Sequence, residues 1–490
     1  MNLNEKKIKL QYKAKKFIEK MALKVDAEPD IEKAFSIAEW IARFLVMNSC
    51  GIYRFDDLEE MLARRLPEPL QQNLLPTRQE IHIASEVYTH GGHTRLIQNL
   101  LDSADCDADV LLIRGNEGRS SVFKTHDGGV IQLDATSNVE RACQIMKHVV
   151  NYKNIFIHIH PEDIVSAAAL KRIRPELKNS QIIFVNHADH TFSLGLASAD
   201  IIFEISSYGW ALRGKRGTEK ISSFIGIPLT PRQAVAVSSA KKNLILSGGD
   251  AYKFKPMAGE NFQKNIKFLL LSNKALNAVI VGPRWQDYWW WSLKLQFGER
   301  LKLNTKLPYK DYVDCLAMCS VYLDSYPLTG GTAFTEALIK GCNVAGMAGS
   351  INGYGMADEL KSQNIFKLNK FVQKIEVQHP DAMKQQETIR KQAVIFHSPI
   401  AVRQRISQTI NTGKMHPLAF SAVTSTSDPW FDLLWIKRAR ITVPGFSNAL
   451  QVTAVIPILL TPLFKSFSLL HVQFFQLFLK AAYSLVMKKK

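Results

Sequence analysis

The sequence predicts an α/β protein built from two parallel-sheet units, with helical segments before the first unit and after the second. Short apolar segments alternate with amphipathic ones in residues 79–229, and the same alternation returns in residues 243–399. A chain of 490 residues is too long for one hydrophobic core. Glycine-rich and polar loops follow several apolar segments, and parallel sheets hold ligand groups at such strand ends.

Composition indicates a folded protein with an acidic partner. Hydrophobic residues make up 46% of the chain and charged residues 22%, as in globular proteins, but the net charge is +18. Such an excess of lysine and arginine favours nucleic acid, anionic lipid or phosphorylated substrates as partners. Zinc-finger, RNA-recognition and P-loop patterns are absent, so nucleic acid is not expected. The six cysteines form no Cys-x-x-Cys pair, which is typical of reduced thiols in a cytosolic protein.

Residues 1–78 are predicted to form a helical region. The apolar positions of residues 31–49 repeat at helical spacing. Residues 6–24 are rich in lysine and lack the apolar segment of a secretory signal. Their basic face is either solvated or in contact with an anionic membrane, and the sequence leaves both alternatives open.

The first unit, residues 79–229, alternates strands with helices. Its expected strands are short apolar runs, and its expected helices are the amphipathic segments between them. We expect strands at 81–84, 109–114, 130–133, 155–160, 181–186 and 200–205, and helices at 94–103, 139–150 and 163–172.

Histidines gather at the carboxyl ends of these strands. After the first strand come His90, Gly91 and Gly92, the candidate acceptor-binding residues, and then His93. With His93, the residues His187, Asp189 and His190 after the fifth strand are the catalytic candidates. An Asp–His pair that faces an acceptor hydroxyl is suited to general-base catalysis, with the carboxylate stabilising the imidazolium. A metal site is the competing interpretation, but the tight spacing of zinc ligands is missing, so no metal cofactor is expected.

The second unit follows a linker at residues 230–242. We expect strands at 244–246, 278–281 and 321–323, and helices at 262–271 and 309–320. Two such units predict a two-lobed protein with a ligand cleft between the lobes.

The stretch from Leu323 to Gly349 is the strongest candidate for a ligand site. Pro327 and two glycines exclude a helix at its start, and Thr332 is expected to cap a helix over 332–340. A glycine loop between a strand and a helix presents free N–H groups and the positive end of the helix dipole, which suits a phosphate group. An ordinary tight turn is the alternative.

Candidate donor-binding residues come from this loop and from the loop after strand 244–246. Lysine, hydroxyl and N–H donors together suit a diphosphate. Glu336, one turn into the helix, is expected either to cap it or to accept hydrogen bonds from sugar or ribose hydroxyls. The full set is Lys253, Lys255, Thr329, Gly330, Gly331, Thr332 and Glu336.

Residues 400–490 are predicted to be a helical tail that associates with a membrane. Trp430 lies near the basic cluster at 437–440, a composition typical of a membrane interface. Two apolar runs, 452–464 and 466–479, are shorter than the about 20 residues that a spanning helix needs. We expect in-plane or re-entrant anchoring at an anionic leaflet, and helices packed on the protein's own surface are the alternative.

Together these residues resemble a known family, the GT-B glycosyltransferases. The two units are Rossmann-like, and a Gly-Gly-His loop follows the first strand. The series after the last strand is similar to the nucleotide-diphosphate loop of O-GlcNAc transferase and related bacterial enzymes; it comprises Asp324, Pro327, residues 329–332, residues 336–338 and Gly341. The segments NHADH (186–190) and YKFKP (252–256) are similar to segments of bacterial cell-surface polysaccharide glycosyltransferases.

The resemblance implies a nucleotide-diphosphate sugar as donor in the second unit and a hydroxyl of a surface glycan or lipid-linked acceptor in the first. Thr329 stands where the family has asparagine, and Glu336 where it has aspartate. The glutamate pair of retaining GT-B enzymes is absent, because Leu328 occupies the earlier position. This departure favours an inverting enzyme with its base in the first unit, and the candidates are, in order, His190, His187 and His93.

The sequence therefore predicts a cytoplasmic GT-B glycosyltransferase, peripheral on the inner face of the bacterial plasma membrane. A polyol-phosphate transferase of the CDP-glycerol type on the same fold is one alternative. A non-catalytic, membrane-bound scaffold that binds nucleotide or glycan is another. The basic composition fits all three.

Overall fold

The architecture comes from a computed structural model of the 490-residue chain. The structure describes residues 3–48, 50–69, 75–88, 92–104, 106–115, 123, 128–229, 242–256, 259–349, 355–420 and 443–459. The chain folds into two compact units, and each is described by itself. The first comprises the described residues within 1–204, 212–223 and 435–490, and the second comprises those within 205–211 and 224–434.

A helical layer opens the first unit, as the sequence predicts. It consists of α1 (Leu3–Ala27), α2 (Ile31–Met47) and α3 (Asp56–Ala63). The carboxylate of Asp30 caps α2 by accepting hydrogen bonds from two amides of the first helical turn (2.9 and 3.3 Å). The apolar face of α2, including the buried ring of Trp40, joins the core under the first sheet.

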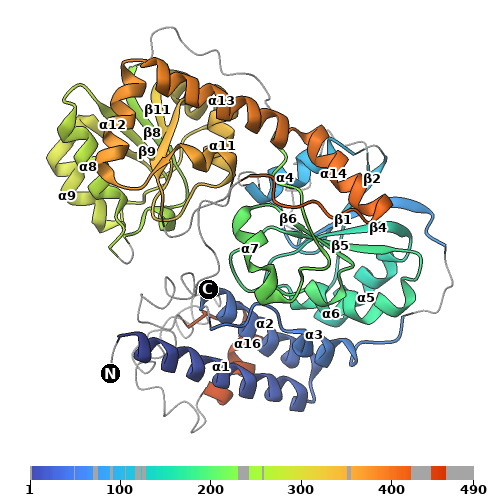
Figure 1. The fold of residues 1–490 in the computed structure, drawn as a ribbon. Coiled ribbons are helices and arrows are strands. Elements are labelled where there is room, and N and C mark those ends of the chain that lie inside the picture. The colour runs from blue at the N-terminus through green and yellow to red at the C-terminus, as the bar shows by residue number, and fades with distance from the viewer. Residues whose placement is uncertain are drawn as a thin grey trace. The chain divides into compact units, whose positions relative to one another are not determined.

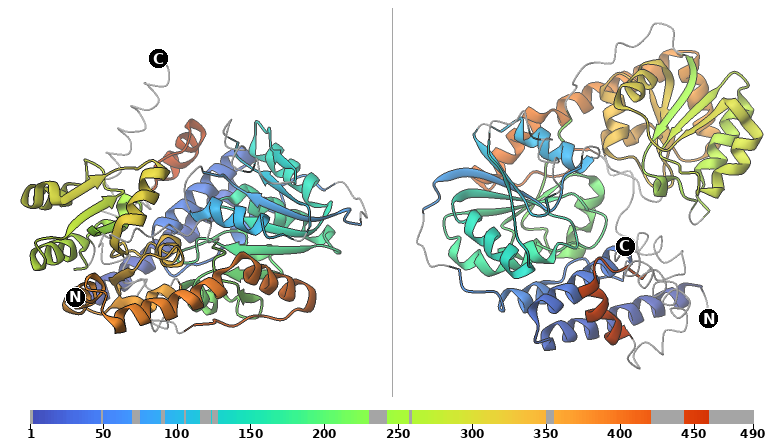
Figure 2. Two further views of the ribbon diagram at one scale, coloured as in Figure 1. Left: turned by 90° about the horizontal axis from the view of Figure 1, so that it is seen from above. Right: turned by 180° about the vertical axis from the view of Figure 1, so that it is seen from behind.

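The described part of the C-terminal tail packs on this layer. Helix α16 (Ala449–Leu459), labelled with α2 in Figure 1, packs against α2, and the right-hand view of Figure 2 shows it crossing the helical layer. Gln451 Nε2 donates a hydrogen bond to the carbonyl of Ser36 (3.0 Å), and Trp40 Nε1 donates one to the carbonyl of Pro444 (3.3 Å). Side-chain and backbone contacts thus join α16 to α2.

This packing bears on the predicted membrane tail. The first apolar run forms part of a packed helix, which is the arrangement given above as the alternative to anchoring. The second run, 466–479, lies outside the described residues, as do Trp430 and the basic cluster at 437–440. Within the described parts of the chain, no helix combines the length and the apolar character needed to cross a membrane. Membrane association stays a prediction.

The described residues of the first unit include a seven-stranded sheet in the order β3-β2-β1-β4-β5-β6-β7, and the pairs of known register are parallel. Its strands are β1 (Arg78–Ala84), β2 (Ala108–Leu112), β3 (Val130–Gln132), β4 (Tyr152–His158), β5 (Gln181–Asn186), β6 (Ile201–Glu204) and β7 (Ser222–Phe224). The accompanying helices are α4 (Gly92–Leu101), α5 (Asn138–Val149) and α6 (Ile164–Ile173), and α7 (Ser207–Arg216) is divided between the two units. Ile81 and Ile83 of β1 pack with α5 and α6 on one face, whereas Ala84 packs with α4 on the other.

The described residues of the second unit include a six-stranded parallel sheet in the order β10-β9-β8-β11-β12-β13. Its strands are β8 (Lys242–Gly248), β9 (Asn277–Val281), β10 (Leu301–Asn304), β11 (Cys319–Leu323), β12 (Val344–Met347) and β13 (Lys361–Ser362). Its longer helices are α8 (Phe262–Ser272), α9 (Trp291–Phe297), α10 (Tyr309–Met318), α11 (Thr332–Ile339), α12 (Ile365–Glu376), α13 (Pro380–His397) and α14 (Pro399–Thr412). Helices α8, α9 and α12 cover one face through Ile245 and Val321, and α11 contacts Tyr322 on the other.

Both sheets are doubly wound, which confirms the predicted fold class. The chain order reverses between β1 and β4 in the first sheet and between β8 and β11 in the second. Ligands of such sheets bind outside the carboxyl ends of the strands beside the reversal. The loops after β1, β4 and β5, and those after β8 and β11, are therefore the places where a site is expected.

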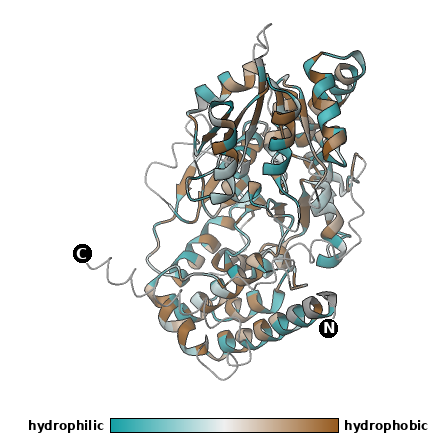
Figure 3. Ribbon diagram, turned by 90° about the vertical axis from the view of Figure 1, so that its left-hand side faces the viewer, coloured by the Kyte–Doolittle hydropathy of each residue, from teal (hydrophilic) through white to brown (hydrophobic). Residues whose placement is uncertain are grey.

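The strands are apolar because a parallel sheet is buried on both faces. Figure 3 shows the strands largely in brown, whereas the helix that starts at the N-terminus alternates between brown and teal. Some polar side chains of the strands break this rule and are fully buried, among them Glu80 and His82 of β1, His158 of β4 and Glu204 of β6.

The predicted elements are largely confirmed, and the differences lie mostly at their ends. Strand β5 has the predicted bounds. Strand β4 ends at His158 rather than at residue 160, because the amide of His160 donates to Ser85 Oγ (2.9 Å) instead of to a strand. Strands β7, β10 and β13 were not predicted, since each is short and contains polar residues.

Candidate functional site

The loop after β11 is held by the buried carboxylate of Asp324. Its Oδ1 accepts hydrogen bonds from the amides of Ser325 (2.9 Å) and Gly330 (2.7 Å). Its Oδ2 accepts one from Thr329 Oγ1 (2.7 Å) and pairs with Lys361 Nζ (2.8 Å). A carboxylate has about four acceptor positions, and these four interactions fill them. The loop is therefore fixed before any ligand binds.

Helix α11 follows this loop and starts with two unused backbone donors. Gly331 is its N-cap residue, with φ 56° and ψ −107°, a conformation that favours glycine. The prediction that Thr332 caps the helix is wrong by one residue, because the turn needs a positive φ at position 331. The amides of Gly330 and Gly331 are occupied, the latter by Thr329 Oγ1 (3.2 Å). Those of Thr332 and Phe334 have no hydrogen-bond partner among the described residues.

Lys253 reaches the same loop from the end of β8. It lies in the 3₁₀ turn η4 (Ala251–Phe254), and its Nζ donates to the carbonyl of Thr329 (3.2 Å). No carboxylate in the described part of the chain lies within ion-pair distance of this ammonium. Burial lowers the pKa of Lys253, although Asp324 and Asp250 act in the opposite direction. A partly buried ammonium without a counter-ion is a binding position for an anion.

The second lysine candidate, Lys255, points elsewhere. It is exposed, and its Nζ lies 5.6 Å from the ring centroid of Trp289. The tryptophans at 285 and 289–291 lie partly in the core and partly on the surface: Trp290 is buried, whereas Trp285 is 78% exposed. Of the two predicted lysines, only Lys253 contacts the loop that opens α11.

Lys361 completes the network, and no sequence motif marked it. Its Nζ lies 2.8 Å from Asp324 Oδ2, 2.5 Å from Asp358 Oδ1 and 3.0 Å from Thr329 Oγ1. Burial alone would lower the pKa of Lys361, but the two carboxylates outweigh it and the pKa is raised. Lys361 is therefore a paired structural charge. Asp358, three residues before Lys361, was the one sign in the sequence that this lysine is paired, whereas Asp324 is remote in sequence.

Glu336 lies one turn into α11 and is engaged within that helix. Its carboxylate pairs with Lys340 Nζ at 2.8 Å, and the two side chains are 18% and 6% exposed. Contact of Glu336 with a sugar or ribose hydroxyl stays a prediction.

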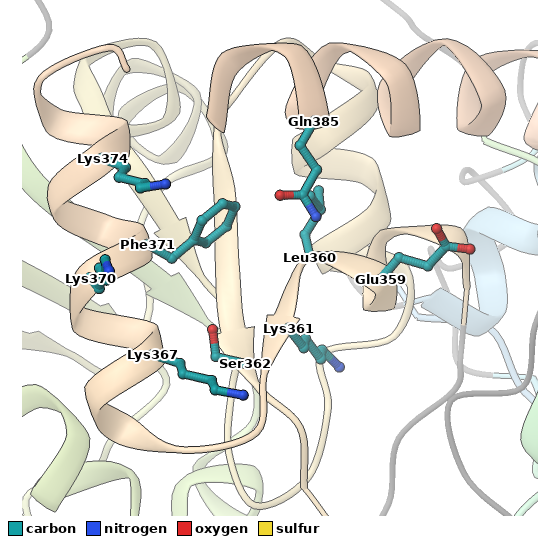
Figure 4. A pocket seen from close by; sticks show the side chains of 9 residues that line it. All are labelled: Glu359, Leu360, Lys361, Ser362, Lys367, Lys370, Phe371, Lys374 and Gln385. Atoms are coloured by element: carbon teal, nitrogen blue, oxygen red, sulfur yellow. The ribbon is translucent and has the colours of Figure 1, made fainter. Parts of the chain in front are cut away.

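A basic pocket of about 250 Å³ lies beside the Asp324 network, between α12 and α13 (Figure 4). Lys367, Phe371 and Lys374 extend from α12 toward the side that carries Gln385. Lys361 also lines the pocket, but its ammonium is already paired with two carboxylates. The charge of this pocket therefore comes from lysines of α12 that have no acidic partner among the described residues.

In the first unit, histidines from three adjacent strand ends meet. His187 follows β5, His158 ends β4, and His93 lies in the first turn of α4, after β1. The ring centroids of His93 and His187 are 4.4 Å apart, and those of His158 and His187 are 5.0 Å apart. The structure thus brings together His93 and His187, two of the three predicted bases.

His93 has one ring nitrogen without a partner. Its Nε2 lies 3.0 Å from the backbone carbonyl of His158, so Nε2 carries the proton. Its Nδ1 then has a lone pair and no hydrogen-bond partner among the described residues. Burial, together with the charge of His160, lowers the pKa of His93 to about 4. The ring is therefore neutral at pH 7.

Asp189 and His190 form the predicted pair, at a different place in the loop. Asp189 is buried, whereas the side chain of His190 is 40% exposed, with its Nδ1 3.5 Å from Asp189 Oδ1. The buried guanidinium of Arg216 fixes the loop by donating to the carbonyl of Asp189 and by pairing with Glu204 (3.6 Å). The imidazole of the first-ranked base, His190, is therefore partly in solvent.

The remaining predicted residues of this unit lie at the start of α4. Gly92 is the first residue of that helix, and His90 and Gly91 lie outside the described residues. Where the structure describes the chain, no group of three or more His, Cys, Asp or Glu side chains is arranged to hold a metal ion. A reaction without metal stays a prediction.

No protein-family model matches the sequence, and no curated protein matches it. Solved structures do match the fold. HepE of Anabaena, in complex with UDP and glucose, superposes with a TM-score of 0.53 at 13% identity, covering 68% of this chain and 100% of HepE. A mutant O-GlcNAc transferase of Thermobaculum terrenum gives 0.51 at 14% identity, covering 81% of this chain and 80% of its own. TarM gives 0.54 at 9% identity, covering 69% of this chain and 99% of TarM.

These structural neighbours are GT-B glycosyltransferases. The chain has the GT-B fold. Its two doubly wound sheets correspond to the two GT-B domains, so the resemblance found in the sequence is confirmed at the level of fold. At this level of identity the GT-B fold is what the comparison establishes, and activity has to be argued from the site.

Proposed function

We propose that the protein is a glycosyltransferase that moves a sugar from a nucleotide-diphosphate sugar to a hydroxyl of a surface glycan or a lipid-linked acceptor. One observation carries the proposal. Lys253 places an ammonium, without an acidic partner in the described part of the chain, at the loop that opens α11, on a GT-B fold. Structures of the neighbour HepE contain UDP or UDP-glucose, which supports a nucleotide-sugar donor here.

The second unit offers three hydrogen-bond donors to a diphosphate. They are Lys253 Nζ and the amides of Thr332 and Phe334, and the positive end of the α11 dipole adds to their effect. Asp324 and Lys361 hold the loop in place. The donors therefore need no rearrangement when charge develops on the leaving diphosphate, which is the condition for effective electrostatic catalysis.

The first unit offers the base for an inverting reaction, which we propose as the stereochemical course. The base removes the proton of the acceptor hydroxyl while the oxygen bonds to the anomeric carbon and the nucleotide diphosphate leaves. Two imidazoles are suited to this step, because burial lowers the pKa of His93 and of His187 and keeps both rings neutral. A neutral imidazole has the lone pair that accepts a proton.

A cytoplasmic position on the inner face of the bacterial plasma membrane would give access to lipid-linked acceptors. The net charge of +18 and the lysine-rich helix α1 support an anionic surface as partner. The apolar run at 466–479 and the terminal lysines support the same location from the sequence.

The test of the proposal is a thermal-shift screen of the full chain against UDP-, GDP- and CDP-linked sugars and CDP-glycerol. A ligand present at 100 times its Kd stabilises the folded state by about 2.7 kcal/mol. We expect a nucleotide-sugar to raise the Tm of the wild type and Lys253→Met to abolish that rise. Lys255→Met is the matched control, because this lysine lies over Trp289 and should leave the response unchanged.

Each other outcome has a defined meaning. If CDP-glycerol is the only ligand that stabilises the protein, the proposed function is polyol-phosphate transfer instead of sugar transfer. A nucleotide-sugar that binds without turnover in the presence of glycan and lipid-linked acceptors would indicate a scaffold. Equal stabilisation of the wild type and Lys253→Met would overturn the proposed donor site.

A further inference from the structure

A chain of hydrogen-bonded side chains runs from the interior of the first sheet to its carboxyl end. We name it the histidine chain, and it consists of Glu80, His82, His158 and His187. Glu80 Oε1 lies 3.1 Å from His82 Nε2, and His82 Nδ1 lies 2.8 Å from His158 Nε2. His158 Nδ1 lies 2.7 Å from His187 Nε2. Glu80, His82 and His158 are fully buried, whereas His187 is half-buried.

The sheet holds these rings in position. Strands β1, β4 and β5 are neighbours, so His82 on β1 and His158 on β4 lie beside each other, and His187 directly follows the next strand, β5. His82 stacks on Phe156 with a centroid distance of 4.6 Å and an interplanar angle of 2°, and its angle to His158 is 10°. At the open end, His187 Nδ1 has no hydrogen-bond partner among the described residues.

With neutral rings, two proton arrangements satisfy the three hydrogen bonds. In the first, Glu80 is ionised, each histidine carries its proton on Nε2 and donates toward Glu80, and His187 presents a bare Nδ1. In the second, Glu80 is protonated and donates to His82, and each histidine carries its proton on Nδ1. The second arrangement contains one proton more than the first. A proton that enters at His187 Nδ1 therefore converts one arrangement into the other.

We propose that the histidine chain is a proton relay through which His187 acts as the acceptor base while Glu80 stores the proton. The proposal rests on the proposed function, because it concerns the hydroxyl that attacks the donor. His187 Nδ1 takes the hydroxyl proton, His187 Nε2–H passes to His158 Nδ1, His158 Nε2–H passes to His82 Nδ1, and His82 Nε2–H passes to Glu80. The hydroxyl oxygen bonds to the anomeric carbon, and the nucleotide diphosphate leaves with the bonding electrons. The relay returns its proton to solvent by the reverse steps.

The relay explains how His187 can act as a base although its surroundings lower its pKa. Burial, followed by the neighbouring histidines, holds the pKa of both His158 and His187 well below the usual range. A proton confined to His187 would make an imidazolium that the partial burial and the neighbouring histidines disfavour. In the relay the charge change occurs at Glu80, and no histidine stays charged. His187, rather than the more exposed His190, is thus the base that the buried network supports.

Glu80 is a positioning residue, and Glu80→Gln tests its role. Glutamine keeps an oxygen that accepts from His82 Nε2–H, so the resting arrangement is retained, but the amide stores no proton. We expect kcat to fall at least tenfold, within the about 10²–10⁴-fold contribution of general-base catalysis, with KM for the nucleotide-sugar unchanged. Glu59→Gln is the matched control: Glu59 is a buried carboxyl of α3 that accepts from the amide of Gly195 (2.8 Å), outside the histidine chain. It should leave kcat unchanged.

A second readout is independent of activity. ¹⁵N NMR of histidine-labelled wild-type protein at pH 7 should show His82, His158 and His187 all with Nε2 protonated and Nδ1 bare. Acidification should move all three to the Nδ1–H form together in the wild type and not in Glu80→Gln. Mixed tautomers along the histidine chain, or an unchanged kcat in Glu80→Gln, would overturn the relay. If no sugar transfer is found at all, the proposed function fails, and the NMR titration still decides whether the relay exists.

Discussion

The two units differ in how their buried ionisable side chains are stabilised. In the second unit, the charges of Asp324, Lys361 and Asp358 are paired and fixed, and the ammonium of Lys253, at the same loop, has no carboxylate partner among the described residues. In the first unit, His158 and His187 are kept neutral by burial, and their hydrogen bonds connect them to a carboxyl group inside the sheet. Fixed charge suits the binding of a diphosphate, and neutral hydrogen-bonded rings suit the movement of a proton. In the reaction proposed above, donor binding is therefore assigned to the second unit and proton transfer to the first.

The largest effect is expected for His187→Ala. Loss of the base should lower kcat by about 10²–10⁴-fold without changing donor affinity, since the donor residues belong to the other unit. Steady-state kinetics with the nucleotide-sugar found in the thermal screen provides the measurement. His148→Ala, on α5 of the same unit, is the control and should turn over normally. A matching loss of donor affinity in His187→Ala would break the comparison.

Asp324→Ala should give the largest loss of stability. It removes one of the two carboxylates that pair with Lys361 Nζ and the acceptor of the Ser325 and Gly330 amides. Breaking a buried ion pair of this kind costs about 3–5 kcal/mol of unfolding free energy, measured by urea denaturation. Asp250→Ala is the control, because that exposed carboxylate should change stability by less than about 0.5 kcal/mol. Equal effects of the two substitutions would contradict the structural role given to Asp324.

Gly331→Ala should act on the same loop through the backbone. A side chain at φ 56° and ψ −107° is strained by about 1–3 kcal/mol, so relaxation would displace the start of α11. We expect both a lower Tm and a weaker affinity for the donor. Scanning calorimetry measures the Tm, and titration calorimetry measures the affinity. Wild-type stability and affinity in this variant would show that position 331 tolerates a side chain and that the loop is less fixed than the Asp324 contacts imply.

The smallest effect concerns pH and Glu59. Burial raises the pKa of Glu59 to about 8, so the folded state binds this proton more tightly than the unfolded state. Its contribution to stability is complete below the ordinary carboxyl pKa and is lost as pH rises through about 8. Between pH 7 and 8, Glu59 alone should lower the unfolding free energy of the wild type by up to about 1.4 kcal/mol per pH unit. Glu59→Gln should show a flatter profile, and identical slopes would refute the assignment.

Much of the fold could be predicted because apolar runs of strand length alternate with helical patterns twice. The same pattern predicted the bounds of β5 correctly. It also predicted that His93 and His187 lie at the same edge of one sheet, as the structure shows. The cap of α11 was misplaced by one residue, because the positive φ of Gly331 depends on how Asp324 folds the loop back. Lys361 was missed, because Asp358 three residues before it is the only local signal and Asp324 reaches it only through the pairing of β11, β12 and β13.

The histidine chain did leave a signal in the sequence. Glu80 and His82 alternate with Ile81 and Ile83 in a strand that a parallel sheet must bury on both faces. Polar residues at alternate positions of such a strand need hydrogen-bond partners inside the protein. That requirement points to neighbouring strands, and the identity of the partner, His158, follows only from strand order and register.

One measurement tests the division between the two units most directly: calorimetric titration of UDP into the wild type, Lys253→Met and His187→Ala, side by side. The account predicts that UDP binds the wild type and His187→Ala with the same affinity and one site per chain, and that Lys253→Met binds at least tenfold more weakly. Absence of UDP binding to the wild type, or equal weakening in both variants, would contradict it.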